Sequence, residues 1–171
     1  MNTFQQHINA EGTTIYSFIE GQPSINLKEI QNDSYSRYDF EFVSGSTVPK
    51  INSDGTRFKY LLNGLCEVKT RNSNIIDYQS EGILIELNKL TAVIRETTIK
   101  QAENINLIYQ PFYLSKYNDV TYLFNLMDCD LGRIQIIRCP KTSSSNGNNE
   151  YVNKACVLLS PDDAIITINH I

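Results

Sequence analysis

The residues whose types and spacing most suggest a catalytic or metal-binding site are Asp128, Cys129 and Asp130. A catalytic thiol needs a pKa lowered by a nearby cation or a helix N-terminus, and two flanking carboxylates would raise that pKa instead. As a calcium loop, the segment lacks the third oxygen ligand, the glycine at the sixth position and the terminal glutamate. Acidic side chains that bond their own backbone are typical of turns, so we predict a hairpin turn over 128–132.

The two histidines give no catalytic arrangement either. His7 and His170 lie near opposite ends of the chain, and no spacing pairs either ring with a nucleophile and an orienting group. The sequence also contains no glycine-rich phosphate-binding pattern and no nucleophile elbow. We therefore expect structural or surface histidines in a protein without a cofactor, and lean towards a protein that is not an enzyme.

Acidic side chains on predicted strands could supply the carboxylate pair of a glycoside hydrolase. The candidates are Glu41, Glu67, Asp77 and Glu86. Strand alternation places such acids on a polar face at no special cost, so the pattern selects no pair among them. An enzyme of unrecognised class is therefore the third of three functional hypotheses.

The four cysteines are Cys66, Cys129, Cys139 and Cys156. They form no C-x-x-C pair, and only two histidines could complete a zinc site, so we predict no metal. In a reducing compartment they are expected to be free thiols that pack as small apolar side chains. Cys129 and Cys139 could face one another across a hairpin, and their pairing depends on geometry that spacing does not supply.

Composition and charge favour an ordinary globular protein. With 171 residues, 41% of them hydrophobic and 20% charged, residues 1–171 are expected to form a single β-rich domain. The net charge of −4 and the scattered lysines and arginines disfavour nucleic acid as a partner. The N-terminal residues 1–7 lack the pattern of a signal peptide, and no apolar run is long enough to span a membrane. We expect a cytoplasmic protein, or one incorporated into an assembly built in the cytoplasm.

The clearest alternation of apolar and polar residues lies over 82–96. Folded about Asn88-Lys89, this stretch would form a hairpin with one wholly apolar face, on which Ile83 lies opposite Ile94. A slip of one residue would turn that face to water, so the pattern fixes the register. We predict two strands here.

Alternation and turn residues predict further strands along the chain. Three more hairpins are expected, joining 13–19 with 24–28, 58–62 with 65–69 about Asn63-Gly64, and 120–127 with 133–139. Single strands are expected at 38–43, 75–78, 106–114, 155–159 and 165–171. Pro111 would place its strand at a sheet edge or a bulge. The fold class is therefore mainly β, an antiparallel β-sandwich or barrel of about ten short strands.

One short helix is expected near residues 98–106. Thr98 and Gln101 resemble a capping box, and Ile99, Ala102 and Ile105 recur at helical spacing.

Aromatic residues and a polar loop give a candidate interaction surface. Aromatic side chains are dense between residues 109 and 122, where they would either fill the core or present a platform to a sugar, a base or a protein. Residues 140–154 are mostly polar and predict a long mobile loop, of the kind that often binds a partner. The candidate surface consists of Tyr109, Phe112, Tyr113, Tyr117, Asn146, Asn148, Asn149 and Tyr151.

Without a catalytic constellation, the many strands favour a structural or assembly protein that acts through protein–protein contacts with a partner or with itself. Residues with A/T-rich codons are abundant, which would suit a viral or phage particle component. The alternative hypothesis is a small-molecule or carbohydrate-binding β-barrel or sandwich with a pocket lined by the same aromatic residues.

Overall fold

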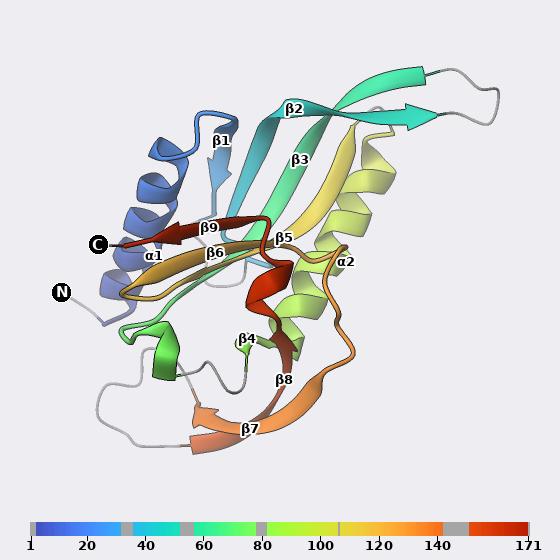
Figure 1. Cartoon of the computed structure of the whole chain (residues 1–171). Helices are drawn as coiled ribbons and strands as arrows, with labels where there is room; N and C mark the ends of the chain where they lie inside the picture. Colours follow the sequence, from blue (N-terminus) through green and yellow to red (C-terminus); the bar gives the residue numbers. More distant parts are fainter. Residues whose placement is uncertain are drawn as a thin grey trace.

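A computed structural model describes residues 3–31, 36–51, 57–77, 82–105, 107–141 and 151–170. Within these ranges the chain is mainly β, as predicted, with nine strands in two sheets and two α-helices (Figure 1). The elements are α1 (Thr3–Glu20), β1 (Ile25–Ile30), β2 (Phe40–Ile51), β3 (Arg57–Thr70), η1 (Ile75–Asp77), β4 (Ile83–Glu86), α2 (Leu87–Glu103), β5 (Ile108–Lys116), β6 (Val120–Asn125), β7 (Ile134–Pro140), β8 (Tyr151–Leu159), η2 (Pro161–Asp163) and β9 (Ile166–Asn169).

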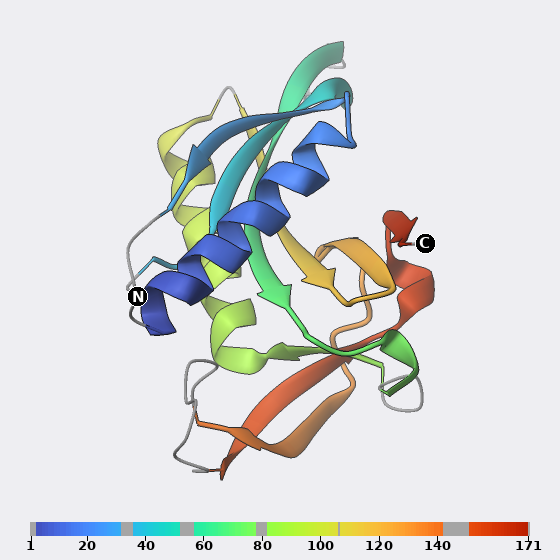
Figure 2. The ribbon, with the colours of Figure 1, turned by 90° about the vertical axis from the view of Figure 1, so that its left-hand side faces the viewer.

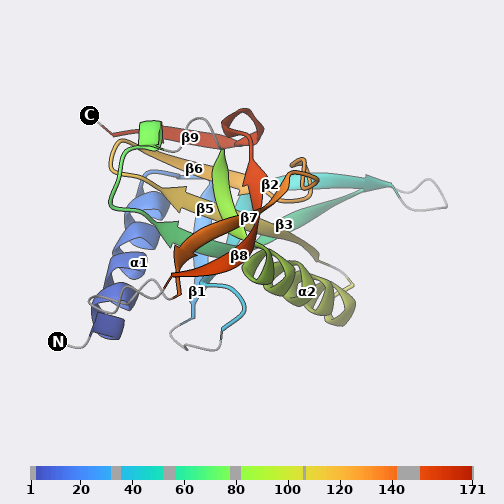
Figure 3. The same ribbon diagram turned by 90° about the horizontal axis from the view of Figure 1, so that it is seen from below.

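The larger sheet has the strand order β1-β2-β3-β5-β6-β9. Its neighbours pair antiparallel except β3 and β5, which run parallel and are joined through β4 and α2. The smaller sheet, β4-β8-β7, is antiparallel throughout. Viewed from below, the smaller sheet lies in front of the larger one, with α1 and α2 to either side (Figure 3).

Alternate residues of the larger sheet face two hydrophobic cores. On one face, Phe40, Phe42 and Phe112 pack with Ile15 and Phe18 of α1, and Figure 2 shows this helix lying across β1, β2 and β3. The second core lies on the opposite face, where buried residues of β3, β5 and β6 meet α2 and the smaller sheet. This period-two division explains why strands of the larger sheet carry large apolar residues on both faces.

The hairpin predicted over 82–96 is wrong in its second half. Ile83 and Ile85 do form a strand, but they pair with β8, opposite Leu159 and Val157. Helix α2 begins directly afterwards at Leu87 and buries Leu90 and Val93. The apolar spacing from residue 87 onwards fits a helix as well as a strand, and tertiary packing decided between them. The helix predicted near 98–106 exists, but it begins earlier and ends at Glu103.

The strand predicted over 13–19 belongs to helix α1. Ile15 and Phe18 are buried and Tyr16 is 55% exposed, which is the three-to-four-residue period of a helix lying on a sheet. The strand predicted over 24–28 is present as β1, but it pairs with β2.

The hairpin predicted at Asn63-Gly64 is also wrong, because β3 runs unbroken through both residues. Gly64 lies opposite Phe42 of β2. The strand predicted over 38–43 is present as this β2, although it begins at Phe40 and runs on to Ile51. A Cβ on Gly64 would lie 2.2 Å from Cε1 and Cζ of the Phe42 ring. The glycine therefore makes room for an aromatic ring rather than for a turn.

The predicted pairing of 120–127 with 133–139 does not occur, because β6 and β7 belong to different sheets. Residues 75–77 form a 3-10 turn rather than a strand. The strand over 106–114 is present as β5, but it lies inside the larger sheet rather than at an edge or bulge. Its Pro111 is tolerated because it lies just past the last β5–β6 pair, where its carbonyl accepts from the Leu126 N–H.

The C-terminal predictions are largely confirmed. Strand β8 contains 155–159 but begins at Tyr151. Ser160 caps the 3-10 turn η2, and the strand predicted over 165–171 follows as β9. The predicted loop over 140–154 is therefore bounded by strands at 140 and 151–154, and its residues 142–150 lie outside the described residues.

Candidate functional site

Four aromatic residues of the predicted interaction surface lie in the core. Tyr109, Phe112, Tyr113 and Tyr117 are 7%, 2%, 2% and 0% exposed. Because β5 has a neighbouring strand on each side and a core on each face, Tyr109 and Tyr113 point into one core and Phe112 into the other. Of the two alternatives, core or binding platform, these four side chains therefore fit the core, and they offer no exposed surface to a partner in this structure.

Of the remaining residues predicted for that surface, Tyr151 is 52% exposed at the start of β8. Asn146, Asn148 and Asn149 lie outside the described residues. Tyr151 belongs to a larger exposed surface that sequence reasoning missed.

This surface is one face of the β7–β8 pair. Ile134 and Ile136 lie opposite Val157 and Ala155 and are 55% and 69% exposed, whereas Val157 is fully buried in the core. The same face continues along the pair, with the Arg138 guanidinium 5.5 Å from the Tyr151 ring centroid. We define the open face as Ile134, Ile136, Arg138, Tyr151 and Asn153. It extends the core-facing side of the smaller sheet beyond the core.

The outer edge of β7 also has open backbone groups. The Arg133 carbonyl accepts from the Leu158 N–H, so the odd-numbered residues of β7 point their backbone groups towards β8. The backbone N–H and carbonyl groups of Ile136 and Arg138 point away from β8, to the side where no described strand pairs with β7. Pro140, which lacks an N–H, falls on this outward side, the usual place for proline in a strand.

Arg71 connects the smaller sheet to the larger one through hydrogen bonds. Its guanidinium donates to Ser115 Oγ at 2.5 Å and to the Leu84 carbonyl of β4 at 2.6 Å. The Tyr113 hydroxyl donates to the same carbonyl at 2.7 Å, and the Tyr117 ring lies 5.1 Å from the guanidinium carbon. Tyr113 and Tyr117, both predicted for the interaction surface, therefore help to attach the smaller sheet, which carries the open face, to the larger sheet.

A cluster of acids and lysines lies where α1, β3 and α2 come together. Burial, followed by the charge of Asp39, raises the pKa of Glu67 from its ordinary 4.5 to about 8. The same two causes raise the pKa of Glu11 to about 7. Lys89 Nζ lies 3.0 Å from Glu67 Oε1, while Glu67 Oε2 is buried without a hydrogen-bond partner. The carboxyl groups of Glu11 and Glu67 are therefore partly protonated near neutral pH.

The other predicted acids form ion pairs. Glu41 accepts from Lys28 at 2.5 Å and from Lys100 at 2.8 Å. Although burial acts to raise it, these hydrogen bonds hold the pKa of Glu41 below its ordinary value. Glu86 pairs with Lys154 at 2.8 Å, and the side chain of Asp77 lies outside the described residues.

The acids at Asp128 and Asp130 accept local hydrogen bonds as expected of a turn, but the predicted hairpin is wrong, because β6 and β7 belong to different sheets. Asp130 Oδ1 accepts from the Gly132 N–H at 2.9 Å, and Asp128 Oδ2 accepts from Asn125 Nδ2 at 2.6 Å. Burial raises the pKa of the Cys129 thiol to about 11, with further contributions from the charges of Asp163 and Asp128. The thiol therefore stays protonated near neutral pH and is a poor nucleophile.

The remaining residues considered for chemistry stay apart. All four cysteines are free thiols, as predicted. His170 Nε2 lies 2.8 Å from Thr121 Oγ1, and the side chain of His7 is outside the described part. In the described ranges, no three acids, histidines or cysteines are placed to hold a metal ion. No helix there is both long and apolar enough to cross a bilayer.

Comparison of the chain with protein-family models, curated proteins and solved structures finds no match. The functional argument therefore rests on the geometry of the chain itself.

Proposed function

We propose that this chain is a non-enzymatic assembly subunit that acts through protein–protein contacts, and that the contact joins the β7 edges of two copies. The observation that supports the proposal is that Ile134 and Ile136 are 55% and 69% exposed on a strand with an open backbone edge. Proteins usually protect such an edge with charge, with a bulge or with a covering element, or else pair it with another chain. Membership of a viral or phage particle stays a prediction.

A two-fold axis through Ile136, perpendicular to the sheet, would pair two β7 strands antiparallel. Ile136 would lie opposite its own copy and exchange both backbone hydrogen bonds with it, because its N–H and carbonyl point outwards. Ile134 would lie opposite Arg138 of the second copy, so no two like charges face one another directly. The two smaller sheets would become one continuous sheet with the exposed isoleucines on one side.

Light scattering over a range of protein concentrations at two salt levels tests this contact. We expect the mass to rise from 19.5 kDa towards twice that value as concentration increases. Salt should have little effect, because the contact uses apolar side chains and backbone groups rather than exposed charges. A wild-type protein that stays monomeric at every concentration would overturn the proposal.

The variant Ile136→Glu places a carboxylate against its own copy and should remain at 19.5 kDa. Its matched control is Ile76→Glu, since Ile76 is also 69% exposed but lies on η1, outside the open face. The control should associate like the wild type. Association that survives Ile136→Glu would show that a different surface is used.

A further inference from the structure

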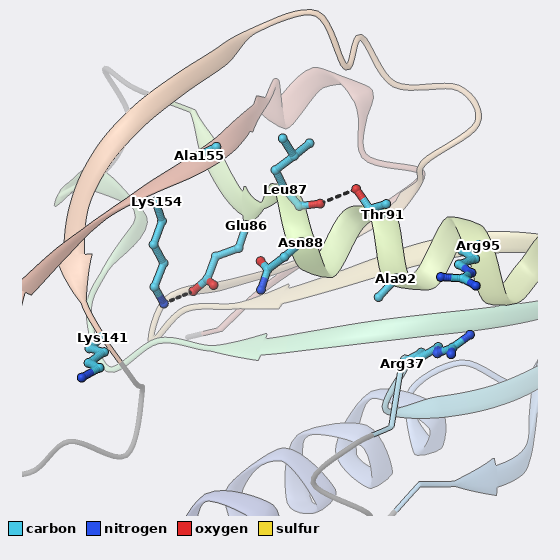
Figure 4. Close-up of a pocket in the computed structure, with 10 residues that line it drawn as sticks. All are labelled: Arg37, Glu86, Leu87, Asn88, Thr91, Ala92, Arg95, Lys141, Lys154 and Ala155. Atoms are coloured by element: carbon cyan, nitrogen blue, oxygen red, sulfur yellow. Dashed lines mark hydrogen bonds and ion pairs between the residues drawn. The ribbon is translucent and has the colours of Figure 1, made fainter.

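An open pocket lies between the N-terminal half of α2 and the β7–β8 pair (Figure 4). Its volume is about 850 Å³, within the usual range of small-molecule sites. None of its lining residues is aromatic, so it is not the aromatic-lined pocket that the sequence suggested as an alternative.

The pocket lining is strongly cationic. Four of the lining side chains are Arg37, Arg95, Lys141 and Lys154, against one carboxylate, Glu86. The chain as a whole has a net charge of −4, so this region reverses the overall sign. A hollow lined by one sign of charge concentrates ligands of the opposite sign.

The ion pairs at the pocket leave donors available. Lys154 gives one hydrogen bond to Glu86 at 2.8 Å and Arg37 gives one to Glu96 at 3.1 Å. An ammonium has three N–H donors and a guanidinium has five. Arg95 has no ion pair or hydrogen bond with any residue in the described part of the chain. Anionic groups could therefore bind without first breaking these pairs.

The cations form two groups. Figure 4 shows Lys141 and Lys154 on one side of the pocket and Arg37 and Arg95 on the other, with Asn88 of α2 between them. Ala92, whose side chain is apolar, also lines the pocket and lies between the two groups in Figure 4. The arrangement fits a ligand with an anionic group at each end and a compact body in the middle.

We propose that this pocket binds a small organic molecule carrying two oxyanion groups, either phosphates or carboxylates. The two arginines would take one oxyanion group, because a guanidinium matches the oxygens of both phosphate and carboxylate with paired hydrogen bonds. The two lysines would hold the other group as point charges. The site differs from the β7 edge contact, since none of the five residues of the open face lines the pocket.

Isothermal titration calorimetry of the full chain at low salt tests the site with three probes: a hexose bisphosphate, citrate and inorganic phosphate. We expect the bisphosphate or citrate to bind more tightly than inorganic phosphate, because only they can span both cation groups. Preference between the first two identifies phosphate or carboxylate as the recognised group. Absence of heat with all three probes at concentrations up to about 1 mM, measured at two temperatures, would overturn the proposal.

Arg95→Ala should weaken binding of the preferred probe by about tenfold or more, through loss of a charge-assisted hydrogen bond. Because Arg95 is exposed and makes no described ion pair, this variant should fold normally. The matched control is Arg133→Ala, which removes an exposed arginine outside the pocket. Equal weakening by both variants would mean binding by net charge alone and would overturn the site.

Discussion

Lys89, in the first turn of α2, forms an ion pair with Glu67 of β3, with Nζ 3.0 Å from Oε1. Glu67 is 6% exposed, and its other carboxylate oxygen has no hydrogen-bond partner. The neighbouring Asp39, whose Oδ2 accepts from the Val68 N–H at 2.6 Å, adds a second acid to the same buried region. The acids Glu67, Asp39 and Glu11 outnumber the two lysines near them, Lys89 and Lys69, and this excess of acids makes stability depend on pH.

We predict that the protein becomes less stable as the pH rises from 6 to 8.5. The pKa of Glu67 rises from 4.5 in the unfolded chain to about 8 in the folded chain, so the folded chain holds the extra proton within this window. For an acid with a raised pKa, the stabilisation is present at low pH and is lost as the pH passes the folded value. Thermal unfolding followed by circular dichroism should show Tm falling by about 2–4 °C per kcal/mol lost.

Glu67→Gln should reduce this slope, because the amide stays neutral at every pH in the window. Glu103→Gln, at an exposed position at the end of α2, is the control and should keep the wild-type slope. A wild-type Tm that is flat or rising over this range would contradict the prediction.

Gly64→Ala should destabilise the protein by about 1–3 kcal/mol or more, because the new Cβ would overlap the buried Phe42 ring. Urea denaturation measures the loss. Adding Phe42→Leu should recover part of it, which shows as a less than additive double-mutant cycle. Gly12→Ala is the control: its Cβ would meet nothing within 4 Å in helix α1, so stability should stay equal or increase by about 0.5–1 kcal/mol.

Proline substitutions should distinguish the two edges of β7. Arg138→Pro removes an N–H that points to the open edge, so we expect a folded protein that no longer self-associates. Ile137→Pro removes an N–H directed at β8 and should lower the free energy of unfolding by about 3 kcal/mol or more. Light scattering and thermal unfolding measure the two effects. An associating Arg138→Pro variant would argue against pairing through this edge.

Arg71→Met should loosen the smaller sheet, because it leaves the partly buried Leu84 carbonyl with only the Tyr113 hydroxyl as a side-chain donor. We expect a loss of about 1–3 kcal/mol and faster amide exchange in β4 than in β3. Tyr113→Phe removes the other donor and should cost about 0.5–1.5 kcal/mol. If both variants exchange like the wild type, Arg71 does not hold the two sheets together.

The sequence alone predicted those features that depend on residues close together in the chain. Alternation of apolar and polar residues indicated a mainly β protein, because successive side chains of a strand point to opposite faces. The acids beside Cys129 indicated an unreactive thiol in a turn, and the raised pKa agrees with this.

Long-range contacts decided the rest. Residues 87–95 have apolar spacing that suits a strand or a helix, and packing against β3 and β5 selected the helix. Gly64 reads as a turn until Phe42 is placed over it. The aromatics of β5 became core because this strand acquired neighbours on both sides. The open face depends on the pairing of β7 with β8. The cationic pocket combines Arg37 with residues of α2 and β8, which lie far apart in the chain and come together only in the folded structure.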